Sequence, residues 1–544
     1  MTVEAGPSRG ILAVCKRIAD SLERNAGIAA ALALSLIFVL ALGQSADKLL
    51  WFDELITLKS ASLPNWRDVS TFYSSGLDTN SPLAALILRA GLILPFSPEI
   101  ASRLPFTFAF LIMCWCMFGF VHRRYPAGYA LAALIFSAYP LLFYFATEAR
   151  AYALVLAAAG VGLYSWQSAV AGRYRPLSIF CLWIALAFAI NAHAFAIFLF
   201  IPFAMAQFVQ DFRNRKPDWA IWFALALFPI GIVPVLHGEL ASKKIYGANF
   251  WSKPDLKSMF ESYTDLLFSG GLTYLVLLLL VAIGAVLLRW QRRLPVSSVE
   301  SPGFSMPEWV LVSMLATLPL YVVPLAYPLH AYHSRYVLYC NIGLIALVVA
   351  AAAEAARRNR IAGAVLLAFF LCAACRYRAA TITDGLRAMV HPGRVHRQLQ
   401  AGFNNLKWVS IIEQSNLPVV TDDPVLYTQL DYYARPELQQ RLYAVTDLGE
   451  LKKYPQTSTC QLNLFCFSKS LSFRVADVAN LRTAYPHFLL AERPDIGDLV
   501  WLPRYLADSQ AAGNAVSTCL GPDCSGKAIN VYDVRFIAAP DHVQ

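Results

Sequence analysis

The stretch "WFDELITLKS" at residues 51–60 places two adjacent carboxylates, Asp53 and Glu54, shortly after the apolar run "IAAALALSLIFVLALG". A carboxylate beside a membrane span is tolerated where it reaches water, a charged partner or a substrate. One carboxylate within hydrogen-bonding reach can remove the proton of an attacking hydroxyl or amine. The pair is therefore either a candidate for acid–base chemistry or, because helix N-termini favour acidic residues, the first turn of a juxtamembrane helix.

Other short segments between apolar runs carry residue types that could bind an anionic substrate. The segments are "YFATEARAY" (144–152), "NAHAF" (191–195) and "YPLHAYHSRYVLY" (327–339). Arginine is the best of these types for phosphate, since its guanidinium can donate two parallel hydrogen bonds. The candidates for substrate binding are Arg103, Arg150, Tyr152, His193, His333, Arg335 and Tyr336, and Glu148 is a further candidate carboxylate.

Each candidate has a structural alternative that the sequence leaves open. Glu148 and Arg150 could form ion pairs with other loops. His193 could be an ordinary buried histidine, and "HSRY" could consist of interface residues that extend toward lipid head groups. No single residue decides between these interpretations.

Composition identifies the elements that must position these residues as membrane helices. The 544 residues are 58% hydrophobic and 15% charged, against about 25% charged in soluble domains. Apolar runs of about 20 residues, the length that crosses a bilayer, recur from Gly27 to about Cys375. The net charge of +10 comes largely from Lys and Arg clusters between these runs, where the positive-inside rule places them, so no nucleic-acid partner is expected. The first run has full spanning length and reads as an anchor.

Charge clusters also order the spans. If the Lys and Arg clusters are cytoplasmic, an even number of crossings separates neighbouring clusters. Residues 176–210 carry no Asp, Glu, Lys or Arg and would be about 52 Å long as one helix, so we predict two spans that turn at "INAHAF". The same rule makes residues 81–96 an interfacial helix, with Arg89 extended toward head groups. About eleven spans result, near 27–46, 104–121, 126–146, 151–170, 177–192, 194–210, 219–236, 267–288, 309–327, 336–353 and 361–377.

The fold class predicted is a polytopic α-helical membrane protein with a soluble C-terminal domain of α/β type. Residues 1–26 form a cytoplasmic segment, 27–378 a transmembrane catalytic domain with a first outer loop at 47–103, and 379–544 an extracytoplasmic domain. In "LPVVTDDPVLYTQLDYYARPEL" we expect a strand, an Asp N-cap and a helix. "FLLAE", "LVWLPRYLA" and "INVYDVRFIA" read as strands.

Cysteine usage supports an extracytoplasmic C-terminal domain. Cys460, Cys466, Cys519 and Cys524 are even in number and lie on the predicted outer side, so disulfides are expected there. Pairing within each close couple is the simplest arrangement. The topology also places every candidate site residue in loops on that outer side, so one outward-facing site could collect them.

The ordered motifs resemble a known family. An acidic pair in the first outer loop is followed by "DTNSPLAALIL", "ASRLPFTFAFL", "YPLLFYFATEARAYALVL" and "NAHAFAIFLF", with a weaker echo at "HSRYVLY". This series resembles the polyprenyl-phosphate-sugar-dependent glycosyltransferases of the glycosyltransferase-C fold, in particular the protein O-mannosyltransferase and aminoarabinose lipid A transferase group. Asn80 stands where the family commonly has His, so the role of that His is not carried over.

The resemblance implies transfer of a sugar from a polyprenyl-phosphate (undecaprenyl-phosphate) carrier to a lipid, glycan or protein acceptor at the outer face of the inner membrane. It implies that Asp53 is the general base of an inverting single displacement and that Glu148 assists, with the C-terminal domain in the periplasm. Adjacent helical residues lie about 100° apart, so Glu54 is expected to orient a cation or a neighbouring loop instead. A divalent metal, Mg²⁺ or Mn²⁺, would suit these acids, although no ligand spacing requires one.

Two other classes of function compete with this interpretation. A lipid-linked oligosaccharide ligase or flippase would also handle polyprenyl phosphates, but the first-loop acidic pair favours transfer of a single sugar. A transporter would place charges near the bilayer midplane and would show repeated halves. The charged residues instead gather at span ends, and the first-loop motifs are not repeated.

Overall fold

The computed structural model describes residues 7–78, 81–138, 140–247, 252–268, 301–447, 449–450, 453–454, 459–493, 501–511, 513–522 and 529–537. The chain forms two compact units, which are described separately. Unit 1 comprises Met1–Ser45, Arg103–Leu236 and Lys253–Val390. Unit 2 comprises Ala46–Ser102, His237–Ser252 and His391–Gln544. The predicted domain boundary at residue 378 falls inside a single helix that runs from Arg360 to Val390.

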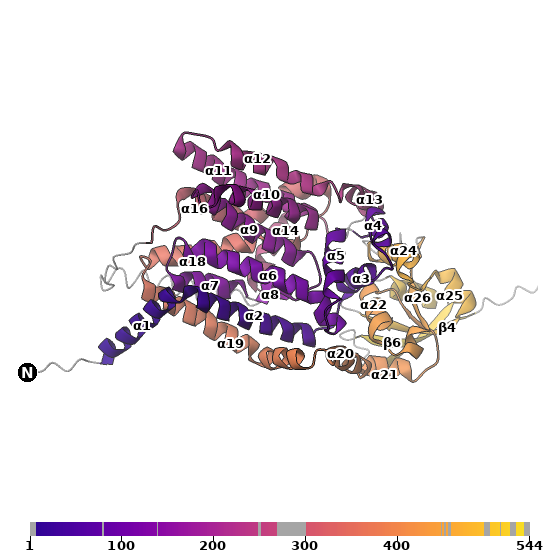
Figure 1. Cartoon of the computed structure of the whole chain (residues 1–544). Coiled ribbons are helices and arrows are strands. Elements are labelled where there is room, and N and C mark those ends of the chain that lie inside the picture. The colour runs from indigo at the N-terminus through magenta and orange to yellow at the C-terminus, as the bar shows by residue number, and fades with distance from the viewer. Residues whose placement is uncertain are drawn as a thin grey trace, which may run out of the picture. The chain divides into compact units, whose positions relative to one another are not determined.

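Unit 1 is built from helices rich in Ala, Leu, Val and Phe (Figure 1). Prolines lie in the first turn of several helices, where the missing backbone N–H costs no intrahelical bond. Pro319 in the first turn of α17 is an example. The helices are α1 (Pro7–Arg24), α2 (Ala26–Asp47), α6 (Pro98–His122), α7 (Ala127–Ser137), α8 (Pro140–Ala146), α9 (Tyr152–Val170), α10 (Arg175–Ala192), η1 (Ala194–Leu199), α11 (Phe200–Asn214), α12 (Trp219–Leu227), η2 (Phe228–Ile232), α14 (Leu256–Phe268), α16 (Met306–Ala316), α17 (Leu318–Ala326), η4 (Tyr327–Leu329), η5 (Ser334–Val337), α18 (Cys340–Ala355) and α19 (Arg360–Val390).

Length and hydropathy confirm a polytopic membrane protein. Among the described residues, five helices are long and apolar enough to cross a bilayer, or up to seven if two bent pairs each count as one span. Shorter apolar helices occupy the predicted spans near 126–146, 336–353 and 361–377. The predicted span at 267–288 lies almost wholly outside the described residues. The predicted turn at "INAHAF" is confirmed, since α10 ends at Ala192 and η1 begins at Ala194.

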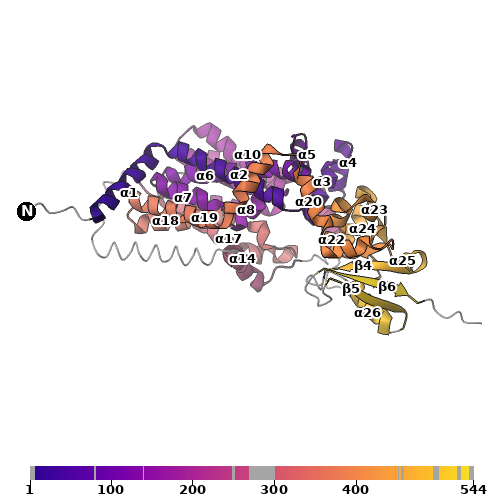
Figure 2. The ribbon, with the colours of Figure 1, turned by 90° about the horizontal axis from the view of Figure 1, so that it is seen from below.

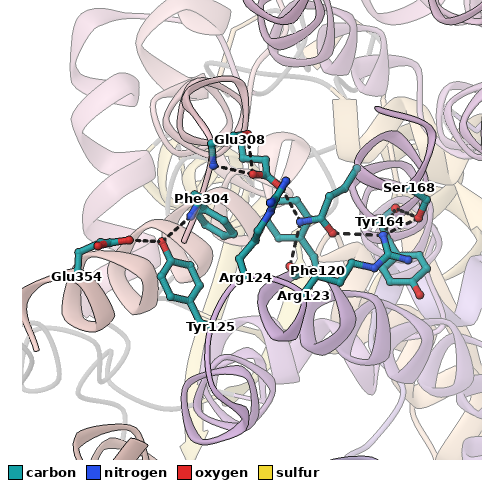
Figure 3. Close-up of polar contacts among 11 residues, drawn as sticks. Phe120, Arg123, Arg124, Tyr125, Tyr164, Ser168, Phe304, Glu308 and Glu354 are labelled. Carbon is teal, nitrogen blue, oxygen red and sulfur yellow. Dashed lines mark hydrogen bonds and ion pairs between the residues drawn. The ribbon is translucent and has the colours of Figure 1, made fainter. Parts of the chain in front are cut away.

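A polar network ties the helices of unit 1 together at the Arg123–Arg124 end of α6 (Figure 3). Arg124 Nε donates to Glu308 Oε1 at 2.8 Å, and Gln167 Nε2 donates to the same oxygen at 2.7 Å. Arg123 Nη1 donates to Ser168 Oγ at 2.6 Å and packs over the ring of Tyr164 at 3.8 Å. Glu308 is almost fully buried, and its other oxygen accepts from the N–H and hydroxyl of Ser305 at the start of α16.

The same network continues to α18. The Tyr125 hydroxyl donates to Glu354 Oε1 at 3.1 Å and accepts from the N–H of Phe304 at 3.1 Å (Figure 3). Arg358 Nε in turn donates to the Glu354 carboxylate. The ends of α6, α9, α16 and α18 are thus joined by hydrogen bonds whose donors and acceptors all belong to the chain.

Unit 2 contains a six-stranded sheet in the order β3-β2-β1-β4-β6-β5. Strands β1 to β4 are parallel, and β6 pairs antiparallel with both β4 and β5. Its strands are β1 (Val419–Thr421), β2 (Leu442–Val445), β3 (Val475–Ala476), β4 (His487–Glu492), β5 (Ala515–Gly521) and β6 (Asn530–Phe536). The sheet confirms the predicted α/β character of the C-terminal region.

Helices cover both faces of this sheet. Figure 2 shows α26 (Leu502–Ala511) on the opposite side of β4–β6 from α22 (Pro424–Tyr433) and α24 (Thr459–Leu471). Val420, Phe488 and Leu490 pack with α26 and α25 (Val478–Ala484) in one buried core. The remaining helices of this part are α20 (Val395–Asn404), α21 (Lys407–Glu413) and α23 (Pro436–Gln439).

Two adjacent acids after β1 begin two helices. Asp423 caps α22, as predicted, by accepting from the N–H groups of Val425 and Leu426, and it also pairs with Arg493 at 2.9 Å. Asp422 Oδ2 accepts from the N–H groups of Trp501 and Leu502 at 2.5 and 2.7 Å. The strand predicted at "LVWLPRYLA" is therefore wrong over its described part, because Asp422 caps a helix that begins at Leu502.

The predicted pairing of Cys460 with Cys466 is also wrong, since Cys466 is a free thiol. Both residues lie on α24, and the six helical steps from one to the other correspond to a rise of about 9 Å. The Cα atoms of a disulfide lie only about 4.4–6.8 Å apart. Cys519 is disulfide-bonded, as expected, and Cys524 lies outside the described residues.

The segment predicted to be the first outer loop folds into short helices of unit 2: α3 (Phe52–Ala61), α4 (Trp66–Ser74) and α5 (Pro82–Gly91). A later segment, α13 (Leu236–Tyr246), contacts the turn that follows α4, where the Ser242 hydroxyl donates to Gly76 O at 2.8 Å. Arg89 donates to the carbonyls of Ala61, Leu63 and Pro64. It therefore fixes the end of α3 instead of extending to head groups as predicted.

Candidate functional site

Three turns of unit 1 gather aromatic and histidine side chains from distant parts of the sequence. His193 joins α10 to η1, and its Nδ1 accepts from the N–H of Phe195 at 3.3 Å. The His193 ring lies 4.9 Å from the ring of Tyr336 and 5.8 Å from that of Tyr152. These residues come from η5, η1 and the start of α9, so the fold assembles this cluster from segments that the sequence places far apart.

The η5 turn repeats the local geometry of the His193 turn. His333 precedes η5, and its Nδ1 accepts from the N–H of Arg335 at 3.2 Å. The Tyr339 hydroxyl donates to Phe195 O at 2.7 Å and links the two turns. Each histidine thus caps a 3₁₀ turn through its Nδ1 atom, which fixes the orientation of the ring.

Two arginines supply positive charge to this cluster. The Arg335 guanidinium lies 5.8 Å from the centroid of the Tyr152 ring, and Arg150 is only 6% exposed. Desolvation of the His193 ring, followed by the charges of Arg150 and Arg335, lowers the pKa of His193 to about 3. His193 is therefore neutral at neutral pH, and the arginine charges act on the space around it. Such a field stabilises a bound anion.

Glu148 and Arg103 are buried near the start of α9 and in α6. Glu148 is 1% exposed, and its backbone carbonyl accepts from the N–H of Arg150 at 2.8 Å. The Thr107 hydroxyl donates to Ala146 O at 2.9 Å and anchors this loop on α6. Arg103 is fully buried and donates through Nη1 to Ser45 O at 3.0 Å.

The histidine–arginine cluster and the network of Figure 3 lie at opposite ends of α9. Tyr152 begins this helix, whereas Gln167 and Ser168 lie in its last turn. Sixteen residues of helix correspond to about 24 Å, close to the hydrocarbon thickness of about 30 Å. The two polar groups are therefore separated by about the length of a membrane span, and the topology predicted from charge would place them on opposite sides of the bilayer.

Asp53 and Glu54 occupy the first turn of α3 in unit 2. Glu54 is fully buried, and its Oε2 accepts from the N–H of Trp51 at 3.3 Å. Glu54 therefore contributes to the helix start in the way that the structural alternative proposed. Asp53 is half-buried, and its backbone carbonyl accepts from the Thr57 hydroxyl at 2.8 Å.

A groove of about 450 Å³ lies at the other end of α3 within unit 2. Leu58, Leu63 and Leu471 give it apolar walls, and Ser62, Ser470 and Tyr432 give it hydroxyls. Lys59 at its rim pairs with Asp431 at 2.5 Å. Its size falls within the range of ligand pockets.

The fold therefore brings part of the predicted site together in unit 1. Some residues of this cluster were not predicted from the sequence. Tyr152, His193, His333, Arg335 and Tyr336 meet through contacts described above, and the charge of Arg150 acts on His193. Phe195 and Tyr339 were not predicted, although both lie in the segments "NAHAF" and "HSRYVLY" that were named for other residues. Asn80 lies outside the described residues. No group of three His, Cys, Asp or Glu side chains that could hold a metal ion is found in the described part of the chain.

The fold and these clusters define a polytopic helical membrane protein that carries a small α/β sheet. No family model and no curated protein matches the chain in sequence. Solved structures of ArnT from Cupriavidus metallidurans do share its fold. The apo structure aligns with a TM-score of 0.50 at 14% identity, and the structure bound to undecaprenyl phosphate with 0.51 at 15%. Each alignment covers 93% of this chain and 97% of ArnT. The chain therefore shares the fold of ArnT, as the order of its sequence motifs predicted.

Proposed function

We propose that this protein is a membrane glycosyltransferase that moves a sugar from an undecaprenyl-phosphate-type carrier to an acceptor at the outer face of the inner membrane. The observation that carries the proposal is the cluster of Arg150, Arg335 and neutral His193 in unit 1. It occurs in the fold of a protein that was solved with undecaprenyl phosphate bound.

In the proposed reaction the carrier phosphate is the leaving group. The acceptor hydroxyl or amine attacks C1 of the sugar while Asp53 takes its proton. The C1–O bond to phosphate breaks, and its electron pair stays on the polyprenyl phosphate. Because that phosphate is a good leaving group, cations matter more than a general acid, and Arg150 and Arg335 supply them. Tyr152, Tyr336 and His333 frame the same cluster.

The other predicted residues take supporting roles in this proposal. Glu54 holds the start of α3 through the Trp51 N–H and so orients Asp53. Glu148, which precedes Arg150 by two residues, holds the cationic loop. Arg103 joins α6 to the end of α2 through Ser45. The groove beside Lys59 is the place on unit 2 where a remote part of the acceptor would bind.

The test compares cells that lack this protein with cells that carry its variants. Lipid-linked sugars, profiled by mass spectrometry, should show an unused polyprenyl-phosphate sugar that disappears on complementation with the wild-type protein. Asp53→Asn removes the base and should lower turnover about 10²–10⁴-fold, so the donor should persist. Asp68→Asn, on α4 of the same outer loop, is the matched control and should complement. Absence of any accumulating lipid-linked sugar, or full complementation by Asp53→Asn in a membrane-inserted protein, would contradict the proposal.

A further inference from the structure

The peptide that leads into α3 is held by side chains from α22. The N–H of Leu50 donates to the Tyr433 hydroxyl at 3.0 Å, and Gln429 Nε2 donates to Leu50 O at 3.3 Å. Leu50 is fully buried, so these side chains satisfy backbone groups that water does not reach. Only Trp51 and Phe52 separate Leu50 from Asp53.

Tyr433 is itself fixed by a buried carboxylate. Its hydroxyl donates to Glu99 Oε1 at 3.2 Å, and His396 Nδ1 donates to the same oxygen at 2.8 Å. Glu99 is fully buried, and Oε2 of Glu99 accepts from no protein group among the described residues. A buried oxygen that accepts no hydrogen bond lowers the stability of the fold. The chain therefore keeps this cluster at a cost in stability, which favours a role beyond holding the fold together.

The far end of α3 is held by the same helix. Lys59 pairs with Asp431, which lies between Gln429 and Tyr433 on α22. The Lys59 ammonium also lies 5.0 Å from the ring centroid of Phe473. One ten-residue helix is thus attached to α22 through Leu50 before its first residue and through Lys59 in its last turn.

We propose that Tyr433, supported by Glu99 and His396, is a positioning residue that sets the location of Asp53. This inference rests on the proposed function of Asp53 as the base. The series of contacts runs from His396 on α20 through Glu99 at the start of α6 and Tyr433 on α22 to the backbone of Leu50. It makes the C-terminal part of the chain a component of the catalytic apparatus. A displacement of a reacting group by about 1 Å can lower a rate about 10²-fold.

The experiment uses the full-length protein in nanodiscs and measures two independent quantities. Tyr433→Phe keeps the ring but removes the hydroxyl. It should lower kcat at least about tenfold with the KM for the lipid-linked donor unchanged, and should speed amide hydrogen exchange of the segment at 49–53. Exchange in β4 and β6 should stay as in the wild type, because the sheet is not altered. Tyr443→Phe removes a hydroxyl that, among the described residues, bonds to Tyr485 at 2.7 Å, and should change neither quantity.

Two further variants keep the test decisive if Tyr433→Phe is poorly expressed. Glu99→Gln retains an oxygen that can accept from Tyr433 and should preserve more activity than Glu99→Ala. Gln429→Ala should also speed exchange at 49–53. If Asp53→Asn abolishes transfer but Tyr433→Phe and Glu99→Ala keep wild-type kcat, the positioning role is refuted while the proposed function stands. If Asp53→Asn itself keeps full turnover, the proposed function fails first. Faster exchange throughout unit 2 in every variant would mean that these residues only stabilise the fold.

Discussion

The two ends of α9 carry arginine clusters of opposite character. At the C-terminal end, Arg123 and Arg124 donate to acceptors of the chain, which include the buried Glu308 and Ser168 (Figure 3). At the N-terminal end, desolvation lowers the pKa of His193, and the charges of Arg150 and Arg335 lower it further. An arginine that donates to a buried carboxylate stabilises the fold, and two arginine charges that act on one neutral ring create a positive field that favours an anionic ligand. The difference separates a structural group of arginines from a candidate for substrate binding.

The largest effect that we expect is the loss of stability caused by removing the Glu308 carboxylate. Glu308→Ala leaves Arg124, Gln167 and Ser305 without their shared acceptor in a buried place. Breaking a buried ion pair by removal of one partner costs about 3–5 kcal/mol. We expect the free energy of unfolding to fall by about that amount, measured by denaturant unfolding of the purified protein. The fraction that stays folded should transfer sugar normally. Loss of transfer with unchanged stability would contradict the structural role of the Arg123–Arg124 network.

Arg335→Ala should lower the use of the lipid-linked donor and leave the stability of the fold nearly unchanged. Hydrogen bonds to charged groups contribute about 1.5–3 kcal/mol, which corresponds to roughly a tenfold to hundredfold loss in the efficiency of donor use. Thermal unfolding should change little. Donor accumulation in complemented cells, followed by lipid mass spectrometry, measures the first quantity. An Arg335→Ala protein that is unstable yet fully active once folded would place Arg335 with the structural arginines.

Protonation of His193 should make the stability of the fold depend on pH. Its pKa falls from an ordinary 6.5 to about 3 in the folded chain, so the unfolded chain takes up a proton between these values and the folded chain does not. Stability should therefore be unaffected above pH 6.5 and should decline as the pH falls from 6.5 toward 3. His193→Asn should flatten this part of the pH–stability curve. An unchanged slope in the variant would show that other groups govern acid unfolding.

The smallest change in stability is expected from an exposed ion pair that belongs to neither arginine cluster. Arg175 pairs with Asp218 at 2.6 Å, with side chains 45% and 25% exposed. Exposed pairs contribute about 0–1 kcal/mol. Arg175→Ala should therefore shift stability by less than about 1 kcal/mol and leave transfer unchanged, which makes it the control for removing an arginine from unit 1. A large loss of transfer in this variant would show that general loss of positive charge, not its location, matters.

Local signals in the sequence predicted much of the fold. The uncharged stretch at 176–210 was too long for one crossing, and the chain does break at His193. Asp423 followed by Pro424 predicted the start of α22 correctly. Local sequence was sufficient to predict these features, because each depends on residues that are close together in the chain.

Features that depend on distant partners were not predictable in this way. Leu502 begins a helix because Asp422, 80 residues earlier, caps it. The bond between Leu50 and Tyr433 joins residues 383 positions apart, and no local pattern indicates it. For the candidate site the sequence identified residue types and their common side of the membrane. It could not assign Arg124 to a structural role, because its acceptor Glu308 lies 184 residues away in the sequence.

The most direct test of the account is binding of undecaprenyl phosphate to the purified protein in nanodiscs, measured by native mass spectrometry. The wild-type protein and Arg175→Ala should retain the lipid equally. The double variant Arg150→Ala/Arg335→Ala should lose at least about tenfold in affinity, since each arginine supplies a charge-assisted contact. Equal binding by the double variant and the wild-type protein would contradict the central claim that this cluster holds the carrier phosphate.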